Sequence, residues 1–231
     1  MPTAPIPGRP RRRSRAKSAQ AEPAPNRRLN ILLAAERLFA AHGFHGVSIR
    51  DVAEEAGVPL ALVGYYFGPK ATLYEQIYRE RAGYIQQRLQ ALALAQQQAA
   101  AGELLDEIVK AFVMPVLALA AHADGRHFLR LLARGINEQL KEDETVVREL
   151  FDPLAHAFID ALQQALAPAS RGTVAWCYQF ALGALLLHVT DQRIERLSRG
   201  ENQFGDEAQA GPVLVRFITA GLRGACQPPR H

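Results

Sequence analysis

The sequence predicts an all-α protein, with a three-helix unit near the N-terminus followed by a larger helical bundle. Three observations support this fold class. Leucine and alanine dominate while aromatic residues make up only 7% of the chain, which favours helices over strands. Apolar residues recur at helical spacing, and no segment alternates apolar and polar residues as a half-buried strand does. Glycine and proline fall between the periodic segments, where helices end and begin.

Three helices are predicted in the N-terminal unit. Apolar spacing predicts a helix over Leu29–Ala41, ended by Gly43. Ser48 is placed to cap a second helix, which Gly57 ends. A third helix is predicted over Pro59–Phe67, because proline is tolerated in a first helical turn.

The rest of the chain predicts six longer helices, which makes about nine in all. The break at Gly68-Pro69 separates them from the first three, and Pro115 is expected to kink one of them. We therefore divide the chain into a disordered arm (1–26), a helix-turn-helix domain (27–73) and a second helical domain (74–231). The six helices are predicted over residues 70–100, 103–121, 125–140, 144–166, 173–196 and 212–225.

The composition is that of a soluble globular protein, with 48% hydrophobic and 22% charged residues in a chain of 231. The longest apolar stretch, Ile108–Ala121, contains Lys110 and Pro115 and is too short to span a bilayer. No apolar segment follows the N-terminal arginines, so no signal peptide is predicted. Cys177 and Cys226 lack metal-ligand spacing, and a reduced cytoplasmic protein with no cofactor or metal is expected.

Charge is distributed unevenly along the chain. Residues 1–28 hold eight basic groups and one acidic group, a net +7, so the remainder of this +4 protein carries −3. Such an arm indicates a polyanionic partner at one end. A solvated tail without a partner is the alternative on charge alone.

Two short helices joined at a glycine carry the clearest functional pattern, that of a DNA-reading helix-turn-helix. Gly57 permits the left-handed turn, and Val58 fills the angle between the two helices. Val63 and Phe67 anchor the second helix to the core. A helix of about eight residues is roughly 12 Å long, which matches the width of a DNA major groove.

Three motifs with fixed spacing lie between residues 29 and 73. They are Phe44-x-x-Val47-Ser48, Ile49-x-x-Val52-Ala53-x-x-Ala56-Gly57-Val58 and Tyr66-Phe67-x-x-Lys70-x-x-Leu73. By these motifs and the amphipathic first helix, the chain resembles the TetR family of bacterial transcription regulators. The remaining two-thirds resembles the family only in architecture, as a bundle that binds a ligand and dimerises. The resemblance implies a ligand-released repressor that acts as a homodimer on a palindromic operator in double-stranded DNA.

The resemblance also implies which residues meet the DNA. The family usually has Ser and Tyr where this chain has Pro59 and Gly64. Glycine in a helix costs on the order of 1 kcal/mol relative to alanine, so we interpret Gly64 as allowing close approach to DNA. The expected contact residues are Ser48, Arg50, Leu60, Ala61, Leu62, Gly64, Tyr65, Tyr66 and Lys70.

The predicted recognition surface is poor in hydrogen-bond donors. Leu60, Ala61 and Leu62 are suited to thymine methyl groups but not to purine edges. Our hypothesis is that Arg50 reads guanine, with the tyrosines and Lys70 placed at phosphates. A surface ion pair between Arg50 and Glu54 is the alternative.

The helix-turn-helix itself is acidic. Residues 29–75 hold three basic and five acidic side chains, a net −2, which is unusual for a surface that meets phosphates. Arginines between positions 9 and 17 supply positive charge, and we expect this arm to strengthen DNA binding, with entry into a minor groove as one route.

The second domain contains candidates for an effector pocket and a dimer interface. A small apolar or amphiphilic effector is expected, held by apolar residues with polar groups nearby at His127, Arg130, Asn137 and Tyr178. An apolar stripe at helical spacing fits intrachain core as well as an interface. The pocket candidates are Phe112, Met114, Val116, Phe128, Leu131, Leu132, Arg134, Trp176 and Phe180, and the interface candidates are Gly183, Ala184, Leu187, Phe217, Ile218 and Gly221.

Two other function classes remain as alternatives. The hypothesis of an enzyme depends on side chains that could bind a metal or transfer a proton. These are His188, Asp191 and Glu195 on one predicted helix, and His122 close to Asp124. No nucleophile motif or phosphate loop accompanies these residues, so we expect no enzyme. A structural adaptor with a vestigial helix-turn-helix is the other alternative.

Overall fold

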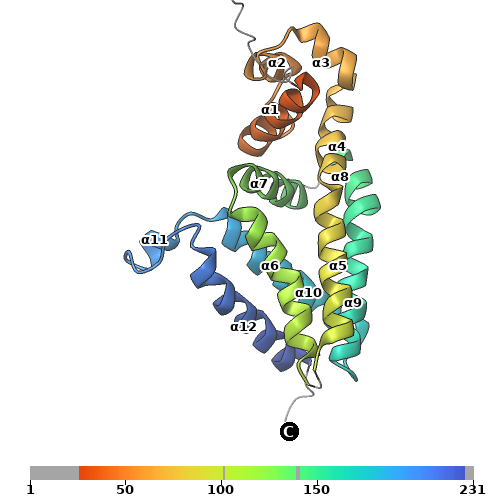
Figure 1. Cartoon of the computed structure of the whole chain (residues 1–231), viewed down its shortest axis with the longest axis vertical. Coiled ribbons are helices and arrows are strands. Elements are labelled where there is room, and N and C mark those ends of the chain that lie inside the picture. The colour runs from red at the N-terminus through yellow and green to blue at the C-terminus, as the bar shows by residue number, and fades with distance from the viewer. Residues whose placement is uncertain (1–25, 101, 139–140, 227–231) are drawn as a thin grey trace, which may run out of the picture.

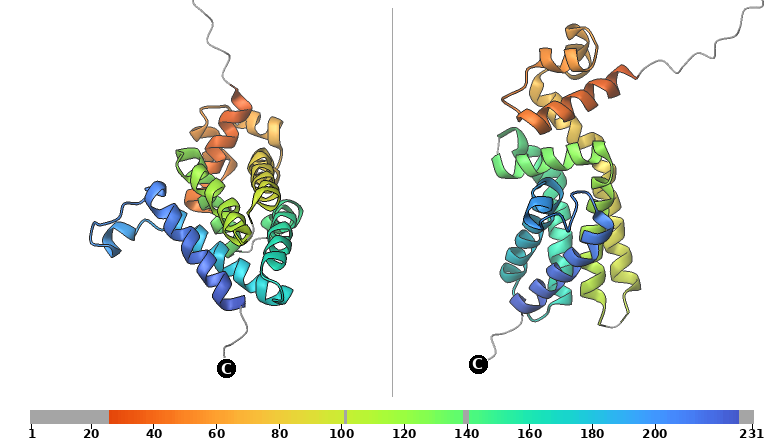
Figure 2. Two further views of the ribbon diagram at one scale, coloured as in Figure 1. Left: turned by 60° about the horizontal axis from the view of Figure 1, so that its bottom comes forward. Right: turned by 90° about the vertical axis from the view of Figure 1, so that its left-hand side faces the viewer.

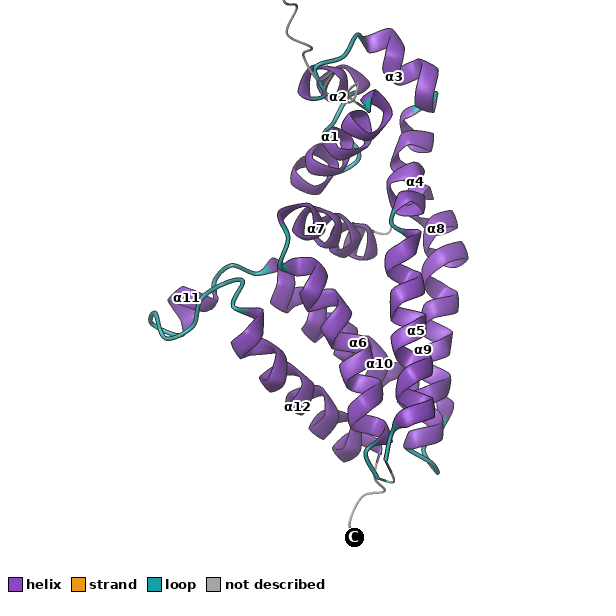
Figure 3. Ribbon diagram, in the orientation of Figure 1, coloured by secondary structure: helices purple, strands orange, loops and turns teal. Residues whose placement is uncertain are grey.

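Three helices pack together at one end of the molecule, and the other helices form the body below them (Figure 1). This computed structural model describes residues 26–100, 102–138 and 141–226. No strand occurs in these ranges, so the predicted all-α class is confirmed for the part of the chain described (Figure 3). The end unit comprises α1 (Arg27–His42), α2 (Ile49–Glu55) and α3 (Leu60–Phe67).

Aromatic packing holds the end unit onto the next helix. The Phe39 and Phe44 rings lie 5.9 Å apart, and each meets the ring of Tyr74 edge-on, at 5.2 and 5.1 Å. Phe39 and Tyr74 are almost completely buried. Edge-to-face rings at this spacing add to the free energy gained by burial alone. The helix that carries Tyr74 is therefore part of the end unit as well as the start of the body.

The body is a bundle of long helices. α6 packs against α5 and α12, and α7 crosses beneath α1 (Figure 1). Its elements are α4 (Lys70–Glu80), α5 (Ala82–Gln98), α6 (Leu104–Ala120), α7 (Ala123–Glu138), α8 (Lys141–Val146), a π-helical segment (Val147–Phe151), α9 (Asp152–Ala165), α10 (Arg171–Thr190), α11 (Ile194–Leu197) and α12 (Glu207–Cys226).

Several boundaries differ from the predicted ones. The single helix expected over residues 70–100 is interrupted at Arg81, whose N–H is donated to the carbonyls of Ile77 and Tyr78. The helix expected over 144–166 contains the π-helical segment. The expected boundary between residues 73 and 74 falls inside α4, which contacts α1 and α3 at one end and adjoins α5 at the other.

Two aspartates set the ends of the last long helices. α10 stops at Thr190 because the Asp191 carboxylate accepts hydrogen bonds from the backbone and side chain of Arg193, which turns the chain. α12 begins at Glu207, five residues before Pro212, because the Asp206 carboxylate accepts from the Gln209 N–H. α11 and its loop, which lie between these helices in the chain, project away from the body at the left of the left-hand view of Figure 2.

Candidate nucleic-acid interface

A reciprocal pair of hydrogen bonds starts α2. The Asp51 N–H donates to Ser48 Oγ at 3.2 Å, and the Ser48 N–H donates to Asp51 Oδ2 at 2.7 Å. Both groups would otherwise be unpaired at a helix N-terminus. The backbone and side-chain hydrogen bonds from Ser48 lower the pKa of Asp51. The Ser48 hydroxyl is therefore engaged in the cap while its exposed edge faces solvent.

The turn between α2 and α3 has the predicted geometry. Gly57 has a φ of +63°, in the left-handed region that favours glycine. The Val58 N–H donates to the Ala53 carbonyl at 3.0 Å. Val63 and Phe67 are buried and attach α3 to the core. The local sequence therefore fixes both the angle of α3 and the face that it presents outward.

The outward face of α3 is apolar and aromatic. Tyr65 is 81% exposed, and its ring meets that of Tyr66 at 5.4 Å. Leu60 and Ala61 are also exposed, while Leu62 is half-buried. In the described chain the ring contacts of these two tyrosines stay within α3, where Tyr66 also lies 6.2 Å from the Phe67 ring, and the core lies on the opposite face of this helix.

Gly64 lies on this same outward face. A Cβ built on Gly64 meets no atom within 4 Å, so nothing in the described chain requires glycine here. Its backbone does not adopt a positive φ either. Neither crowding nor backbone conformation within the described chain therefore explains the glycine. That Gly64 permits close approach of an outside molecule stays a prediction.

The Lys70 ammonium, which was expected to contact a DNA phosphate, forms hydrogen bonds inside the protein. It donates to the carbonyls of Phe44 and Val47 at 2.9 and 3.0 Å and lies 4.2 Å from the centre of the Phe44 ring. These contacts hold the loop before α2 against the start of α4. Two of the three ammonium protons are thus used inside the protein, and a phosphate contact through the third stays a prediction.

Arg50 is exposed on α2, and in the described structure it forms no ion pair with Glu54. The alternative hypothesis, a surface ion pair between Arg50 and Glu54, is therefore not supported by the described structure. Arg37 instead pairs with Glu55 at 3.0 Å, which neutralises one acidic group of the end unit. The basic arm, residues 1–26 in our division, lies outside the described residues except for Asn26, whose side chain caps α1.

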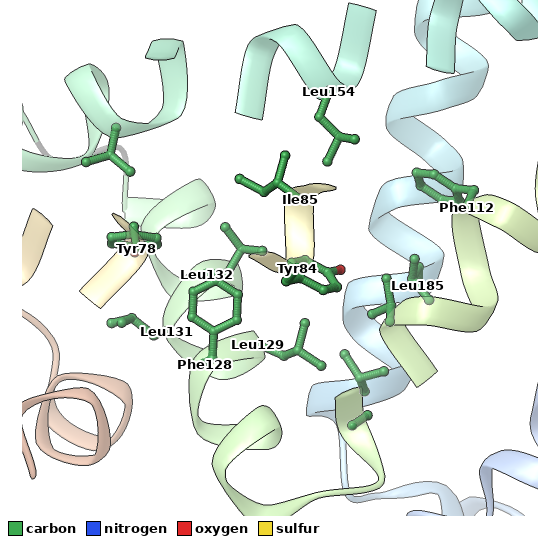
Figure 4. Close-up of a cluster of buried hydrophobic side chains, with 14 of the residues drawn as sticks. Tyr78, Tyr84, Ile85, Phe112, Phe128, Leu129, Leu131, Leu132, Leu154 and Leu185 are labelled. Atoms are coloured by element: carbon green, nitrogen blue, oxygen red, sulfur yellow. The ribbon is translucent and has the colours of Figure 1, made fainter. Parts of the chain in front are cut away.

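The predicted pocket residues do not form one site. Phe112, Val116, Phe128, Leu131 and Leu132 are buried inside the body, and Figure 4 shows four of them in one apolar cluster. The remaining predicted residues lie elsewhere: Met114 is exposed on α6, Arg134 pairs with Glu138 at 3.2 Å beside the end of α1, and Trp176 and Phe180 are exposed on α10.

The outward position of Trp176 and Phe180 follows from the register of α10. This helix buries Val174, Cys177, Ala181 and Leu185 at helical spacing, so the tryptophan and phenylalanine fall on the other face.

Large apolar side chains are exposed together on α10 and α12, and we call them the α10–α12 face. Trp176, Phe180 and Phe217 are 62%, 66% and 67% exposed, and the first two rings are stacked 6.0 Å apart. Gly183 and Gly221 have open space around a built Cβ, which permits close approach of another helix. The α10–α12 face comprises Trp176, Phe180, Gly183, Ala184, Leu187, Val213, Phe217 and Gly221.

One predicted interface residue lies elsewhere. Ile218 is buried in the core of the chain beneath the α10–α12 face, because it follows Phe217 by one position and so points to the other side of α12. By length and composition alone, α10 is apolar enough to span a membrane, but one such helix is weak evidence for a membrane span, and 33% of its apolar window is buried.

The residues behind the enzyme alternative do not converge. His188 Nε2 lies 2.9 Å from Glu207 Oε2, whereas Asp191 pairs with Arg193. Within the described ranges, no group of three His, Cys, Asp or Glu side chains is placed to hold a metal ion. The His188–Glu207 contact joins α10 to α12, and the Asp191–Arg193 pair lies in the turn before α11.

Two arginines important to the structure were not identified from the sequence. Arg81 joins the end unit to the body, and Arg88 is buried inside the body. A sequence signal for Arg88 exists, since Ile85, Arg88, Leu92 and Ala95 fall on one helical stripe that is otherwise apolar. No such signal exists for Arg81, which depends on a partner far away in the chain.

Comparison with known families gives two matches in different parts of the chain. Residues 31–77 match the model described as bacterial regulatory proteins, tetR family. Residues 110–221 match the model described as tetracyclin repressor-like, C-terminal domain. Together the two models cover more than half of the chain, and the first contains the whole of α2 and α3.

Known proteins agree with this assignment. The chain is 30% identical over 121 residues to the Bacillus subtilis (strain 168) protein named "Probable HTH-type transcriptional regulator YttP", which covers 52% of this chain. The match spans about half, 53%, of that relative's length.

Solved structures share the fold at lower identity. The crystal structure of HlyIIR, a hemolysin II transcriptional regulator, matches 84% of this chain and 96% of its own at 18% identity, with a TM-score of 0.58. A ketosteroid transcriptional regulator of Mycobacterium tuberculosis matches 86% of this chain and 96% of its own at 16% identity, with a TM-score of 0.61.

Proposed function

Since the chain belongs to the TetR family of bacterial transcriptional regulators, we propose that it binds a palindromic DNA operator as a homodimer and is released by a small effector. The observation that carries the proposal is the exposed face of α3. Val63 and Phe67 fix this helix from beneath, so Tyr65 and Gly64 are free to meet an outside molecule. A rigid helix of this length fits a major groove.

The apolar character of α3 determines how the DNA is read. Leu60 and Ala61 offer methyl groups to thymine, whereas tyrosine hydroxyls donate to phosphates. Arg50 is exposed and unpaired by Glu54, so its guanidinium is available to a guanine edge. Because residues 29–75 carry a net −2, we propose that the basic arm supplies much of the electrostatic attraction.

A second copy of the chain is the proposed occupant of the α10–α12 face. Exposed Trp176, Phe180 and Phe217 form a continuous apolar surface of the kind that marks interfaces. Tryptophan, tyrosine and phenylalanine contribute most when such surfaces are buried. A twofold pairing through this face leaves α3 of each copy at the far end of its molecule, as a palindromic operator requires (Figure 1).

Effector release is proposed to act through α4, α5 and α7. α7 packs against α1, and Arg81 lies where α4 gives way to α5. An effector that binds better to a rearranged body would shift the population toward dimers whose α3 helices miss the half-site spacing of about 34 Å. This function places the protein in the cytoplasm, at the nucleoid, as a regulator rather than an enzyme.

DNA binding to the region upstream of the protein's own gene tests the proposal. Fluorescence anisotropy compares that duplex with a shuffled duplex of the same composition, at two salt concentrations. We expect tight binding to the natural duplex only, with two chains for each palindrome. Tyr65→Ala should weaken it, whereas Leu94→Ala, which removes an exposed apolar side chain on α5, should not. Equal affinity for both duplexes, unaffected by Tyr65→Ala, would refute sequence-specific regulation.

A further inference from the structure

The body contains a buried arginine without an ion-pair partner. Arg88 on α5 is only 4% exposed. Its Nη2 donates to the Phe112 carbonyl at 3.2 Å, while its Nε is buried and has no hydrogen-bond partner. Among the described residues, no acidic side chain forms an ion pair with it, whereas nine other arginines there pair with Asp or Glu.

Aromatic rings from three helices surround this guanidinium. Its Cζ lies 5.0 Å from the ring centre of Phe112 on α6, 5.2 Å from that of Phe158 on α9 and 5.7 Å from that of Tyr84 on α5. Tyr178 on α10 stands beside the Phe112 ring at 5.6 Å. Figure 4 shows Tyr84 and Phe112 within the same buried cluster as Leu185. Four helices of the body therefore converge on one positive charge.

The surroundings stabilise this charge only in part. Ring faces attract a cation, but less strongly than a carboxylate does in a place that excludes water. Buried charges in proteins are as a rule paired, because desolvation of an unpaired ion is costly. The Phe112 carbonyl accepts from one of the five N–H donors of the guanidinium, and the Tyr84 hydroxyl is a second hydrogen-bond partner of Arg88. The buried Nε is left without a partner, and no carboxylate in the described chain pairs with the charge.

We infer that Arg88 binds the carboxylate of a monoanionic effector whose apolar body lies among Tyr84, Phe112 and Phe158. This inference rests on the proposed function, since it names the class of molecule that releases the regulator. A planar carboxylate matches the forked donors of a guanidinium, and aromatic walls accommodate an aryl or alkyl body.

The neighbouring tyrosines favour one negative charge over two. Burial raises the pKa of both Tyr84 and Tyr178, so each hydroxyl stays protonated and neutral. They add donors to the site without adding charge of their own. One guanidinium balances one carboxylate, whereas the second charge of a phosphate monoester would be left uncompensated.

A purely structural role for Arg88 is the rival explanation. Its bond to the Phe112 carbonyl lies near Pro115, where α6 lacks one backbone N–H. On that view, Arg88 stabilises α6 and binds nothing. The two explanations differ in whether carboxylates bind, and in whether binding depends on this side chain.

Thermal unfolding of the full chain with defined probes separates them. The probes are phenylacetate and octanoate, each paired with its primary amide as the uncharged control. For the wild type we expect both acids, well above their Kd, to raise the Tm by about 2 °C or more, with the amides without effect. Arg88→Met should abolish the rise, and Arg88→Lys should weaken carboxylate binding at least tenfold, because it keeps the charge but loses the fork.

Several outcomes would overturn the inference. An acid that stabilises Arg88→Met as much as the wild type binds elsewhere, and amides as effective as acids show that charge is not recognised. Failure of both acids to stabilise the wild type also refutes it. If Arg88→Met does not fold, unchanged carboxylate affinity in Arg88→Lys decides against the inference and a tenfold loss supports it.

DNA binding without probe distinguishes this failure from failure of the regulator itself. If the wild type binds its upstream duplex but neither acid, the proposed DNA-binding function stands and the carboxylate site is refuted. If the wild type binds the acids through Arg88 but binds no DNA, the carboxylate site stands and the proposed DNA-binding function is refuted.

Discussion

The Glu36 carboxylate accepts hydrogen bonds from Nη2 and Nε of Arg81 at 2.6 and 2.9 Å, across 45 positions of sequence. Burial raises the pKa of Glu36, and the Arg81 guanidinium opposes this shift. The hydrogen bond to Glu36 raises the pKa of Arg81, so the arginine keeps its charge. Arg81 also lies 5.6 Å from the Phe128 ring of α7. One ion pair therefore joins α1, the break between α4 and α5, and α7.

Glu36→Gln should destabilise the protein. The substitution leaves the Arg81 charge without its carboxylate in a largely buried place, which costs about 2 kcal/mol of unfolding free energy. Urea unfolding measures this loss. The matched control is Glu55→Gln, which breaks the exposed pair with Arg37 and should cost less than about 1 kcal/mol. Equal losses in the two variants would show that the buried pair contributes no more than an exposed one.

Gly64→Ala should separate stability from DNA binding. Alanine meets open space there and raises helix propensity, so the unfolding free energy should rise by up to about 1 kcal/mol. Affinity for operator DNA should fall roughly tenfold, the scale of one mismatched base pair, because the added methyl blocks close approach. Gly83→Ala, also in open space but on α5, serves as control and should leave DNA affinity unchanged. A Gly64→Ala variant of normal affinity would contradict the close approach.

Lys70→Met should lower stability as well as DNA affinity. It removes the hydrogen bonds to the Phe44 and Val47 carbonyls, at a cost of about 2 kcal/mol. Arg50→Met removes an exposed cation and should change stability by less than about 0.5 kcal/mol, while relaxing sequence preference. Differential scanning calorimetry compares the two variants. If both unfold like the wild type, the Lys70 contacts have no structural role.

Phe217→Asp should convert a dimer into a monomer. The substitution places a charge at the centre of the α10–α12 face, where burial against a second copy would leave it unpaired. Sedimentation velocity at low micromolar concentration measures the change, and circular dichroism confirms that the variant folds. Leu94→Asp on α5 adds the same charge at an exposed leucine and should leave the association unaltered. Monomeric wild-type protein under these conditions would refute the proposed interface.

Cys226 should react slowly with alkylating reagents. Its Sγ lies 3.9 Å from that of Cys177, and burial together with this neighbour raises its pKa to about 11. The thiolate fraction at about pH 8 should be roughly a hundredfold below that of an ordinary thiol.

The sign of the pH effect follows from the raised pKa. Folding favours the protonated thiol, so the resulting stability is present below pH 9 and is lost as pH rises through about 11. Peptide-level mass spectrometry after iodoacetamide treatment should show the rate rising with pH up to that value. The urea-unfolded chain is the control, and identical rate profiles in both states would contradict the shifted pKa.

The local features of the DNA-binding unit could be predicted from the sequence because short-range interactions determine them. Ser48 and Asp51 are three residues apart, and their hydrogen bonds close within one helical turn. Gly57 sits where the backbone needs a positive φ. The all-α class follows for the same reason, since helical hydrogen bonds and the 3.6-residue period act over a few residues.

Helix boundaries were predicted less well where individual hydrogen bonds, and not the apolar period, determine where a helix ends or begins. α5 was not separated from α4 because the apolar pattern continues through Arg81. The start of α12 at Glu207 depends on an Asp206 cap that the polar composition of the loop concealed. The first boundary is marked by backbone hydrogen bonds of Arg81 and the second by one side-chain cap, and neither leaves a repeated pattern in the sequence.

The sequence by itself thus determined that this protein is helical, and where its helix-turn-helix lies. Only the tertiary structure decided that Trp176 faces outward, that Arg81 meets Glu36 and that Arg88 is buried without a carboxylate. Helix propensity and turns depend on neighbours a few residues away, whereas burial and pairing depend on which distant helices pack together. The environment of Arg88, one arginine among apolar residues of α5, depends on how four helices pack around it.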